Sequence, residues 1–278
     1  MLERSKNLLY SLQKLRTILP QTQLFSYEIL NVVEAPYNQK WLICFYGFGQ
    51  EATVFDKLNE VTCNRYSILV INLPYNSIWQ KWSISSFNHE FSNLLVELNI
   101  IKYISISFSI GSRLNLCLTE NSLTKIEHLI CIAPDGIQAN FWNNICTKTK
   151  AGNFLFKYFL VSTNFLPKIV EFAHRTSLPP KYLYVFVLQN IRHRVSRLKL
   201  YSTWMSMRHF NPNLKKINDI IQKNKSRATF YLGKHDKIIK PNIQKRIQES
   251  IPCAQVILLD SGHDILNENL FKLIAKQL

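Results

Sequence analysis

Glycine is scarce in this chain, with seven residues in 278. A chain that avoids glycine retains it where the backbone bends tightly or approaches another group closely, so each position carries information. Acidic residues are also few: 18 Asp or Glu stand against 34 Lys or Arg, which gives a formal net charge of +16 at pH 7. Long apolar runs are missing, because stretches such as "YSILVINLP" are far too short to span a bilayer as helices.

The six cysteines are scattered, without a C-x-x-C pair or a His/Cys cluster at metal-ligand spacing. We therefore predict no metal site, and reduced, buried thiols that act as small apolar groups. The segment "MLERSKNLLYSLQKLRTILP" carries charges among its apolar positions, so neither a signal peptide nor an anchor is indicated. Together these features predict a cytoplasmic protein.

The positive charge is concentrated in one segment. Residues 141–225 contain fifteen Lys or Arg and only two acidic residues, Glu171 and Asp219. This excess fits an anionic partner, whether nucleic acid, a membrane surface or an acidic protein, and equally a solvated basic face in a chain rich in Lys, Asn and Ile. No RRM, helix-turn-helix or zinc-finger signature supports dedicated nucleic-acid recognition.

Short apolar runs rich in β-branched and aromatic residues recur along the chain and predict strands. Most are apolar on both faces, which is typical of a parallel sheet covered by helices. Amphipathic stretches lie between them, such as residues 85–99, where Phe87 and Phe91 share one face and Ser85 or Ser86 is the expected cap. The alternation predicts an α/β protein with a mostly parallel, doubly wound sheet. The predicted strands are 24–30, 41–48, 66–74, 102–109, 128–134, 228–233 and 254–260.

The alternation stops between Ile137 and Asn224. Aromatic helical stretches such as "NFLFKYFL" and "KYLYVFVLQNIRHRV" replace it, interrupted by "LPP". A mostly helical insertion, placed after the strand that ends near residue 134, explains this pattern best. We therefore predict one core in two parts, 1–136 and 225–278, with a helical lid at 137–224.

Five of the seven glycines follow predicted strands, at the edge where open α/β sheets build their sites. Ser109 lies beside one of them in "SISFSIGSR", where an alternating strand ends in a small-residue turn that leads into an apolar helix. That position aims a side chain out of the sheet. The five glycines are Gly47, Gly49, Gly111, Gly233 and Gly262.

These stretches together resemble an α/β-hydrolase of the serine esterase type with a helical lid. "FYGFGQ" resembles the H-G-x-G oxyanion turn, and "SFSIG" the G-x-S-x-G nucleophile elbow. "LGKHDKIIKP" is similar to the acid loop of the family and "LDSGHDIL" to its histidine loop. The likeness runs from about residue 40 to the C-terminal end, and the order Ser, Asp, His is the order of the family.

The resemblance implies a role for each matching residue. Ser109 would be the nucleophile, and His263 the general base and then the general acid. Asp236 would hold the imidazole in the tautomer that accepts the serine proton. Asp260 and Asp264 flank the histidine and are poorer candidates for the acid, because neither ends the preceding strand.

Two positions depart from the family pattern. Tyr46 replaces the histidine before Gly47, and Ser107 replaces the first glycine of the elbow. A phenol can hydrogen-bond as the histidine would, and neither change removes a catalytic atom. Both leave room for a non-catalytic protein of this type.

A serine nucleophile predicts acyl transfer to water through an acyl-serine, and argues against the dehalogenase and epoxide hydrolase branches, which use aspartate. The backbone N–H groups of Phe48 and Ile110 would form the oxyanion hole. The implied substrates are carboxylic esters or thioesters and, less often, activated carbon–carbon bonds. The mechanism requires no metal and no organic cofactor.

The predicted lid adds aromatic and basic side chains. Most of the aromatic surface would pack on the core, and part would line an apolar acyl pocket. Basic residues, Arg197 among them, would guide an anionic substrate or partner, such as an acyl group on an acidic carrier protein or coenzyme A. The candidate substrate-binding residues of the lid are Trp142, Phe159, Arg192, Arg194 and Trp204.

Two rival interpretations remain open. A catalytically silent protein with the same fold would bind nucleic acid or an acidic partner through the basic lid. A serine peptidase of the iminopeptidase type would need acidic lid residues to recognise a free amino terminus, and this lid has almost none.

Overall fold

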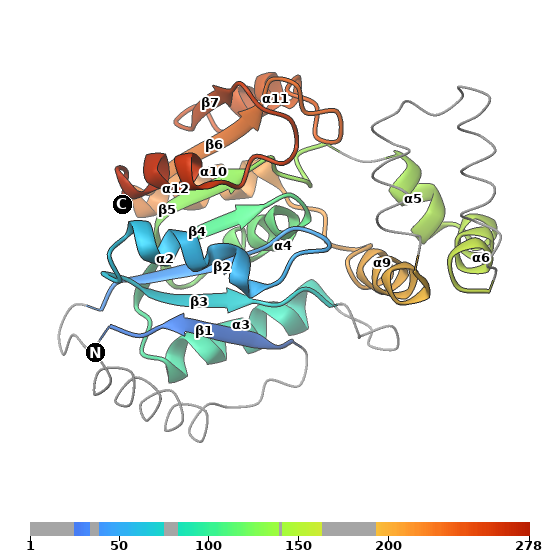
Figure 1. Ribbon diagram of the computed structural model, residues 1–278, viewed down its shortest axis with the longest axis horizontal. Coiled ribbons are helices and arrows are strands. Elements are labelled where there is room, and N and C mark those ends of the chain that lie inside the picture. The colour runs from blue at the N-terminus through green and yellow to red at the C-terminus, as the bar shows by residue number, and fades with distance from the viewer. Residues whose placement is uncertain (1–24, 34–38, 75–82, 139–140, 163–192) are drawn as a thin grey trace.

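A computed structural model describes residues 25–33, 39–74, 83–138, 141–162 and 193–278. All seven predicted strands are present and form one sheet in the order β1-β3-β2-β4-β5-β6-β7 (Figure 1). β1 pairs antiparallel with β3, and the other pairings are parallel. The strands are β1 (Tyr27–Asn31), β2 (Trp41–Phe45), β3 (Ser67–Ile71), β4 (Lys102–Phe108), β5 (Lys125–Ile132), β6 (Arg227–Gly233) and β7 (Gln255–Leu259).

The central strands are buried on both faces, as their unbroken apolar sequences require. Every residue of β2 and β3 is buried, whereas β1 and β7 at the two edges of the sheet are mostly half-buried or exposed. One hydrophobic cluster joins the strands to the helices on both sides. The predicted fold class, an α/β protein with a mostly parallel sheet, is therefore correct.

Helices cover both faces of the sheet (Figure 1). The helices α3, α4 and α10 pack side by side on one face, where α11 lies next to α10, and α2 packs against α12 on the other. A 3-10 turn, η1, leads into α2. Their bounds are η1 (Ala52–Phe55), α2 (Asp56–Val61), α3 (Ile84–Glu97), α4 (Ile110–Thr119), α10 (Leu214–Asn224), α11 (Ile243–Ser250) and α12 (Glu268–Ala275).

The start of α3 corrects the predicted cap. The N-cap is Ser83, whose side chain accepts a hydrogen bond from the backbone N–H of Ser86 at 3.0 Å. Ser85 and Ser86 lie inside the first turn, so their backbone is already helical and neither can cap it. The predicted apolar face is correct, because Phe87 and Phe91 are buried.

The prediction that the cysteines are buried is correct for three of the six. All six are free; Cys44, Cys117 and Cys131 are buried, Cys146 is half-buried, and Cys63 and Cys253 are exposed. Within the described ranges no helix is both long and apolar enough to cross a membrane.

In the described part of the chain, four further helices lie between β5 and β6, beside the carboxyl ends of the strands (Figure 1). The buried Ser202 hydroxyl of α9 donates to the carbonyl of Pro74 at 2.9 Å and so ties this group to the segment after β3. Leu160 and Tyr201 form a small apolar cluster between η2 and α9. The four are α5 (Phe141–Lys148), α6 (Lys150–Lys157), the π-helix η2 (Tyr158–Ser162) and α9 (Arg194–Ser206).

The next helix, α10, packs differently. It contacts β5, α4 and α11, and it buries Leu214, Ile217 and Ile221 against the core. The predicted lid boundary at residue 224 would place α10 in the lid. We therefore propose that the boundary between the lid and the second part of the core lies before Leu214.

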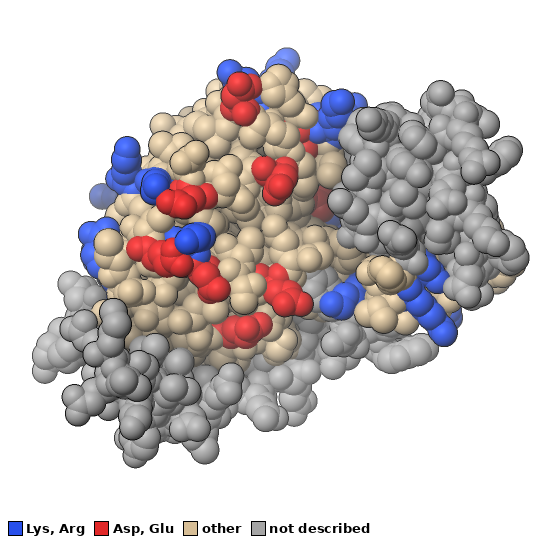
Figure 2. All heavy atoms as spheres, viewed as in Figure 1, with Lys and Arg blue, Asp and Glu red and all other residues tan. Residues whose placement is uncertain are grey.

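Charge is distributed unevenly over the described surface. On the face shown in Figure 2, the core carries Asp and Glu among Lys and Arg, whereas α9 shows only Lys and Arg. Neither α6 nor α9 contains an acidic residue. The Lys and Arg residues of α9 therefore lie on a surface without acidic residues of that helix, beside the carboxyl ends of the strands.

Candidate active site

The turn between β4 and α4 holds Ser109 in a strained conformation. Its φ of 50° and ψ of −123° are unusual for a residue with a side chain, and such a conformation costs about 1 to 3 kcal/mol. Three backbone hydrogen bonds hold it: the Ser109 N–H donates to Ile132, and the Ser109 carbonyl accepts from Ser112 and Asp135, each at 3.0 Å. The turn points the hydroxyl away from the sheet.

Gly111 allows α4 to lie close to β2. A Cβ atom at this position would stand 2.4 Å from the carbonyl oxygen of Tyr46 and 2.6 Å from that of Phe45. Both are backbone atoms that cannot rotate away. The glycine in "SFSIG" is therefore required by the approach of a helix to a strand.

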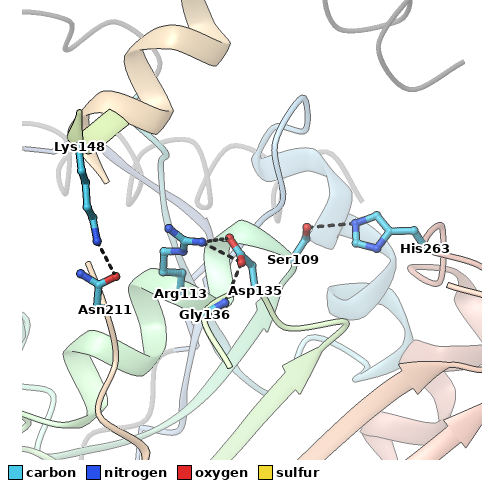
Figure 3. A network of polar contacts seen from close by, with 7 residues as sticks. All are labelled: Ser109, Arg113, Asp135, Gly136, Lys148, Asn211 and His263. Carbon is cyan, nitrogen blue, oxygen red and sulfur yellow. Dashed lines mark hydrogen bonds and ion pairs between the residues drawn. The ribbon is translucent and has the colours of Figure 1, made fainter. Parts of the chain in front are cut away.

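Ser109, His263 and Asp236 form one hydrogen-bonded series. The Ser109 Oγ lies 3.0 Å from Nε2 of His263, and Nδ1 of the same ring lies 2.7 Å from Oδ2 of Asp236. Figure 3 shows the serine and the imidazole facing one another from opposite loops. The three residues predicted from separate strand ends are thus brought together, although 154 positions separate the serine from the histidine.

The Asp236 carboxylate is fully buried, and the imidazole is one-fifth exposed. Oδ1 of Asp236 accepts from the backbone N–H groups of Ile238 and Ile239, both at 2.8 Å. An ionised carboxylate can only accept hydrogen bonds, so the contact with Oδ2 requires that Nδ1 of His263 carries the ring proton. Nε2 is then left as the acceptor that faces the Ser109 hydroxyl.

The loops that carry Asp236 and His263 are joined through their backbones. Lys234 N–H donates to Leu259 at 2.9 Å, and His235 N–H donates to Ser261 at 3.0 Å. A Cβ at Gly233 would stand 2.5 Å from the Gly262 carbonyl oxygen, so glycine permits this approach.

Asp260 and Asp264, the aspartates close to His263 in sequence, form no hydrogen bond with its ring among the described residues. Asp260 instead contacts His235 at 2.8 Å, and both of these side chains are largely exposed. Asp236 alone is both buried and aimed at Nδ1 of His263.

Tyr46 links the turn after β2 to the segment after β3 by hydrogen bonds. Its hydroxyl donates to Oδ1 of Asn72 at 3.1 Å and accepts from the backbone N–H of Leu73 at 3.2 Å. Burial raises the pKa of Tyr46 to about 12, so the hydroxyl keeps the proton that it donates. The phenol thus holds the turn that contains Gly47 and Phe48.

We expect Tyr46→Phe to lower the free energy of unfolding by about 1 to 3 kcal/mol, because it leaves the buried Leu73 N–H without an acceptor. Urea unfolding of the two proteins would measure this difference. Tyr66→Phe is the control, since no hydrogen bond of the Tyr66 hydroxyl is seen within the described residues. A Tyr46→Phe protein as stable as the control would show that the hydroxyl does not hold the turn.

Ser107, the other departure, is accommodated in a buried polar cluster. Its hydroxyl donates to the Ile130 carbonyl at 3.3 Å and accepts from Nδ2 of Asn115 at 3.0 Å. Asn115 also donates to Ser105 at 3.3 Å. No sequence motif singled out Asn115, because an asparagine in an apolar helix has no distinctive spacing.

A largely buried ion pair beside the elbow was also missed. Nη2 of Arg113 lies 2.9 Å from each carboxylate oxygen of Asp135 (Figure 3). Arg113 belongs to the first turn of α4, and Asp135 follows β5. The position of an arginine four residues after the candidate nucleophile was the available signal.

The predicted lid residues have different surroundings. Arg194 is exposed at the start of α9, and Trp204 stacks on Phe156 with 5.2 Å between ring centres. Arg197, in contrast, is buried and donates from Nε to the Leu160 carbonyl at 2.8 Å, so this contact lies within the insertion. Arg192 lies outside the described residues, as do the side chains of Trp142 and Phe159.

The predicted oxyanion residues follow the carboxyl ends of two neighbouring strands, β2 and β4. Ile110 is the first residue of α4 and is buried, and Phe48 is half-buried in the turn after β2. No group of three or more His, Cys, Asp or Glu side chains in the described ranges could hold a metal ion.

Comparison with known protein families and with curated proteins finds no match. Solved structures do match. MenH from S. aureus is 16% identical with a TM-score of 0.63, over 90% of this chain and 96% of that one. The enol-lactonase from Burkholderia xenovorans LB400 is 14% identical with a TM-score of 0.60, over 91% and 95%.

A carboxylesterase from the thaumarchaeon Nitrososphaera gargenis is likewise 14% identical, with a TM-score of 0.60 over 91% of this chain and 93% of that one. The likeness extends over nearly the whole length of each protein, while the sequence identity is low. It therefore establishes the architecture. The chain has the fold of the α/β-hydrolase superfamily.

Proposed function

We propose that this protein is a serine hydrolase that cleaves a carboxylic ester or thioester with an apolar acyl group. The observation that carries the proposal is the hydrogen-bonded series from Ser109 through His263 to the buried Asp236. A chance contact of three polar side chains would not also require a strained serine at the tip of a strand. A carboxylesterase and an enol-lactonase among the structural neighbours are consistent with ester chemistry.

In the acylation step, Ser109 Oγ attacks the carbonyl carbon of the ester while Nε2 of His263 takes the hydroxyl proton. Asp236 stabilises the imidazolium that forms. The carbonyl oxygen becomes an oxyanion, which accepts hydrogen bonds from the N–H groups of Phe48 and Ile110. Ile110 suits this role because the first N–H groups of a helix have no acceptor within it and the helix dipole favours negative charge there.

Collapse of the tetrahedral intermediate breaks the bond to the leaving group. His263 gives its proton to the departing alcohol or thiol, and an acyl-serine remains. A water molecule then attacks the acyl carbon while His263 takes a proton from it. Collapse of the second intermediate releases the carboxylic acid and returns the proton to Ser109.

We assign the lid role to the helices between β5 and α10. The stacked Phe156 and Trp204, together with Trp142 and Phe159, would contribute apolar surface to an acyl pocket. Arg194 is the described residue best suited to meet an anionic group such as coenzyme A or an acidic carrier protein. The cytoplasmic location remains a prediction.

A serine-directed fluorophosphonate probe tests the proposal without knowledge of the substrate. We expect the wild-type protein to be labelled, and Ser109→Ala and His263→Ala to lose labelling by at least about 10³-fold, because the activated hydroxyl or its base is gone. His235→Ala is the matched control, since His235 lies next to Asp236 in sequence and contacts only the exposed Asp260 in the hydrogen bonds of its ring. Folded wild-type protein that resists the probe would favour the catalytically silent binding protein.

A further inference from the structure

Arg113 and Asp135 form a polar cluster that the proposed mechanism does not use. Their side chains are 8% and 19% exposed, so a charged pair is largely withdrawn from water. The backbone N–H of Gly136 also donates to Oδ1 of Asp135, at 2.8 Å. The carboxylate is therefore fixed from two sides, by a helix and by the chain that enters the insertion.

The same aspartate reaches the candidate nucleophile through its backbone. Its N–H donates to the Ser109 carbonyl at 3.0 Å. The contacts close a ring that runs from Ser109 along the first turn of α4 to Arg113, across the ion pair to Asp135 (Figure 3), and back to Ser109 through the backbone hydrogen bond. Only three residues lie between Ser109 and Arg113 in the chain, and the other links of the ring are direct contacts. A shift of the ion pair would therefore move the turn at Ser109 as well.

Stability alone is a poor reason for this pair. Removing a guanidinium and a carboxylate from water costs free energy that their attraction offsets only in part, and apolar residues of similar volume often serve as well. Nε of Arg113 is in addition buried and has no hydrogen-bond partner among the described residues. The strained φ of Ser109, in contrast, persists only where its surroundings over-determine it.

We infer that the Arg113–Asp135 ion pair positions the nucleophile: it fixes the carbonyl of Ser109 and so keeps the Ser109 hydroxyl within hydrogen-bond distance of Nε2 of His263. This inference rests on the proposed function. Both residues are positioning residues, because they act through the backbone of Ser109. The pair also couples the start of the helical insertion, at Gly136, to the elbow.

The test compares fluorophosphonate labelling rates of the wild type with those of Arg113→Met, Arg113→Lys and Asp135→Asn. We expect Arg113→Met and Asp135→Asn to react about 10- to 100-fold more slowly, as for a displaced nucleophile. Arg113→Lys should recover part of the rate, because an ammonium retains the charge but not the planar, two-oxygen contact.

Two further variants separate positioning from general destabilisation. The double variant, Arg113→Met with Asp135→Asn, leaves no unpaired buried charge, so it should fold even if one of the single variants does not. Its labelling rate should be no higher than that of the slowest single variant that folds. Lys102→Met removes the matched ion pair between the amino ends of β4 and β5, where Lys102 and Glu127 lie 3.0 Å apart. We expect it to label within about twofold of the wild type, because such half-exposed pairs contribute little.

Labelling of the folded double variant at the wild-type rate would overturn the inference, as would a loss explained entirely by the unfolded fraction seen by circular dichroism. A labelled wild type with an unaffected double variant overturns only the inference. A wild type that is folded and never labelled overturns the proposed function, and the inference with it.

Discussion

Asp236→Asn is expected to lower the rate of fluorophosphonate labelling, and of ester hydrolysis, by about 10⁴-fold. Oδ1 of Asp236 accepts from Ile238 and Ile239, so the amide oxygen of an asparagine would stay with these donors. Its NH₂ group would then face Nδ1 of His263 and donate to it. That arrangement moves the imidazole proton to Nε2, which can no longer accept the proton of Ser109.

The control for this experiment is Asp260→Asn. Asp260 is the neighbouring acid in the histidine loop and pairs with the exposed His235, so its replacement should leave labelling within about twofold. Hydrolysis of a short-chain 4-nitrophenyl ester would provide a second readout. An Asp236→Asn protein that is folded and retains a tenth or more of the wild-type rate would remove Asp236 from the mechanism.

The second large effect is expected from Gly111→Ala, which should lower the free energy of unfolding by at least about 3 kcal/mol. The new Cβ would stand 2.4 Å from the carbonyl oxygen of Tyr46, which follows β2, and 2.6 Å from that of Phe45, the last residue of β2. Since these atoms belong to the central strand region, α4 itself would have to move outward. Guanidinium unfolding monitored by tryptophan fluorescence would measure the loss.

Gly262→Ala is the matched comparison. A Cβ at Gly262 would meet no atom within 4 Å, so we expect a change of no more than about 0.5 kcal/mol. Equal stability of the two alanine variants would show that α4 and β2 do not approach as closely as described.

The strand pattern could be predicted because the strands are buried on both faces. A run such as that of β2, WLICF, contains no polar residue that could face solvent, and only a sheet covered by helices on both sides accommodates it. Helix boundaries were less predictable. Three serines stand near the start of α3, and the cap is Ser83, because only there is the backbone extended.

The candidate triad was predictable from motifs at strand ends, since parallel strands deliver their carboxyl ends to one edge of the sheet. The supporting residues were not. Arg113, Asn115 and Asp135 carry no motif of their own, and their roles depend on the partners that the packing of α4 against β4 and β5 supplies. The basic residues of the insertion illustrate the same limit, because Arg197 is buried although Arg194 is exposed.

The sequence by itself determined the fold class, the strands and the positions of Ser109, Asp236 and His263 at strand ends, because these follow from local hydrophobic pattern and from short motifs. Only the tertiary structure decided which hydroxyl faces which imidazole, where the Asp135 carboxylate lies, and whether α10 packs with the core. Such contacts join residues far apart in the chain. They depend on the register of strands and the approach of helices, which are fixed by packing many side chains at once and not by any short segment.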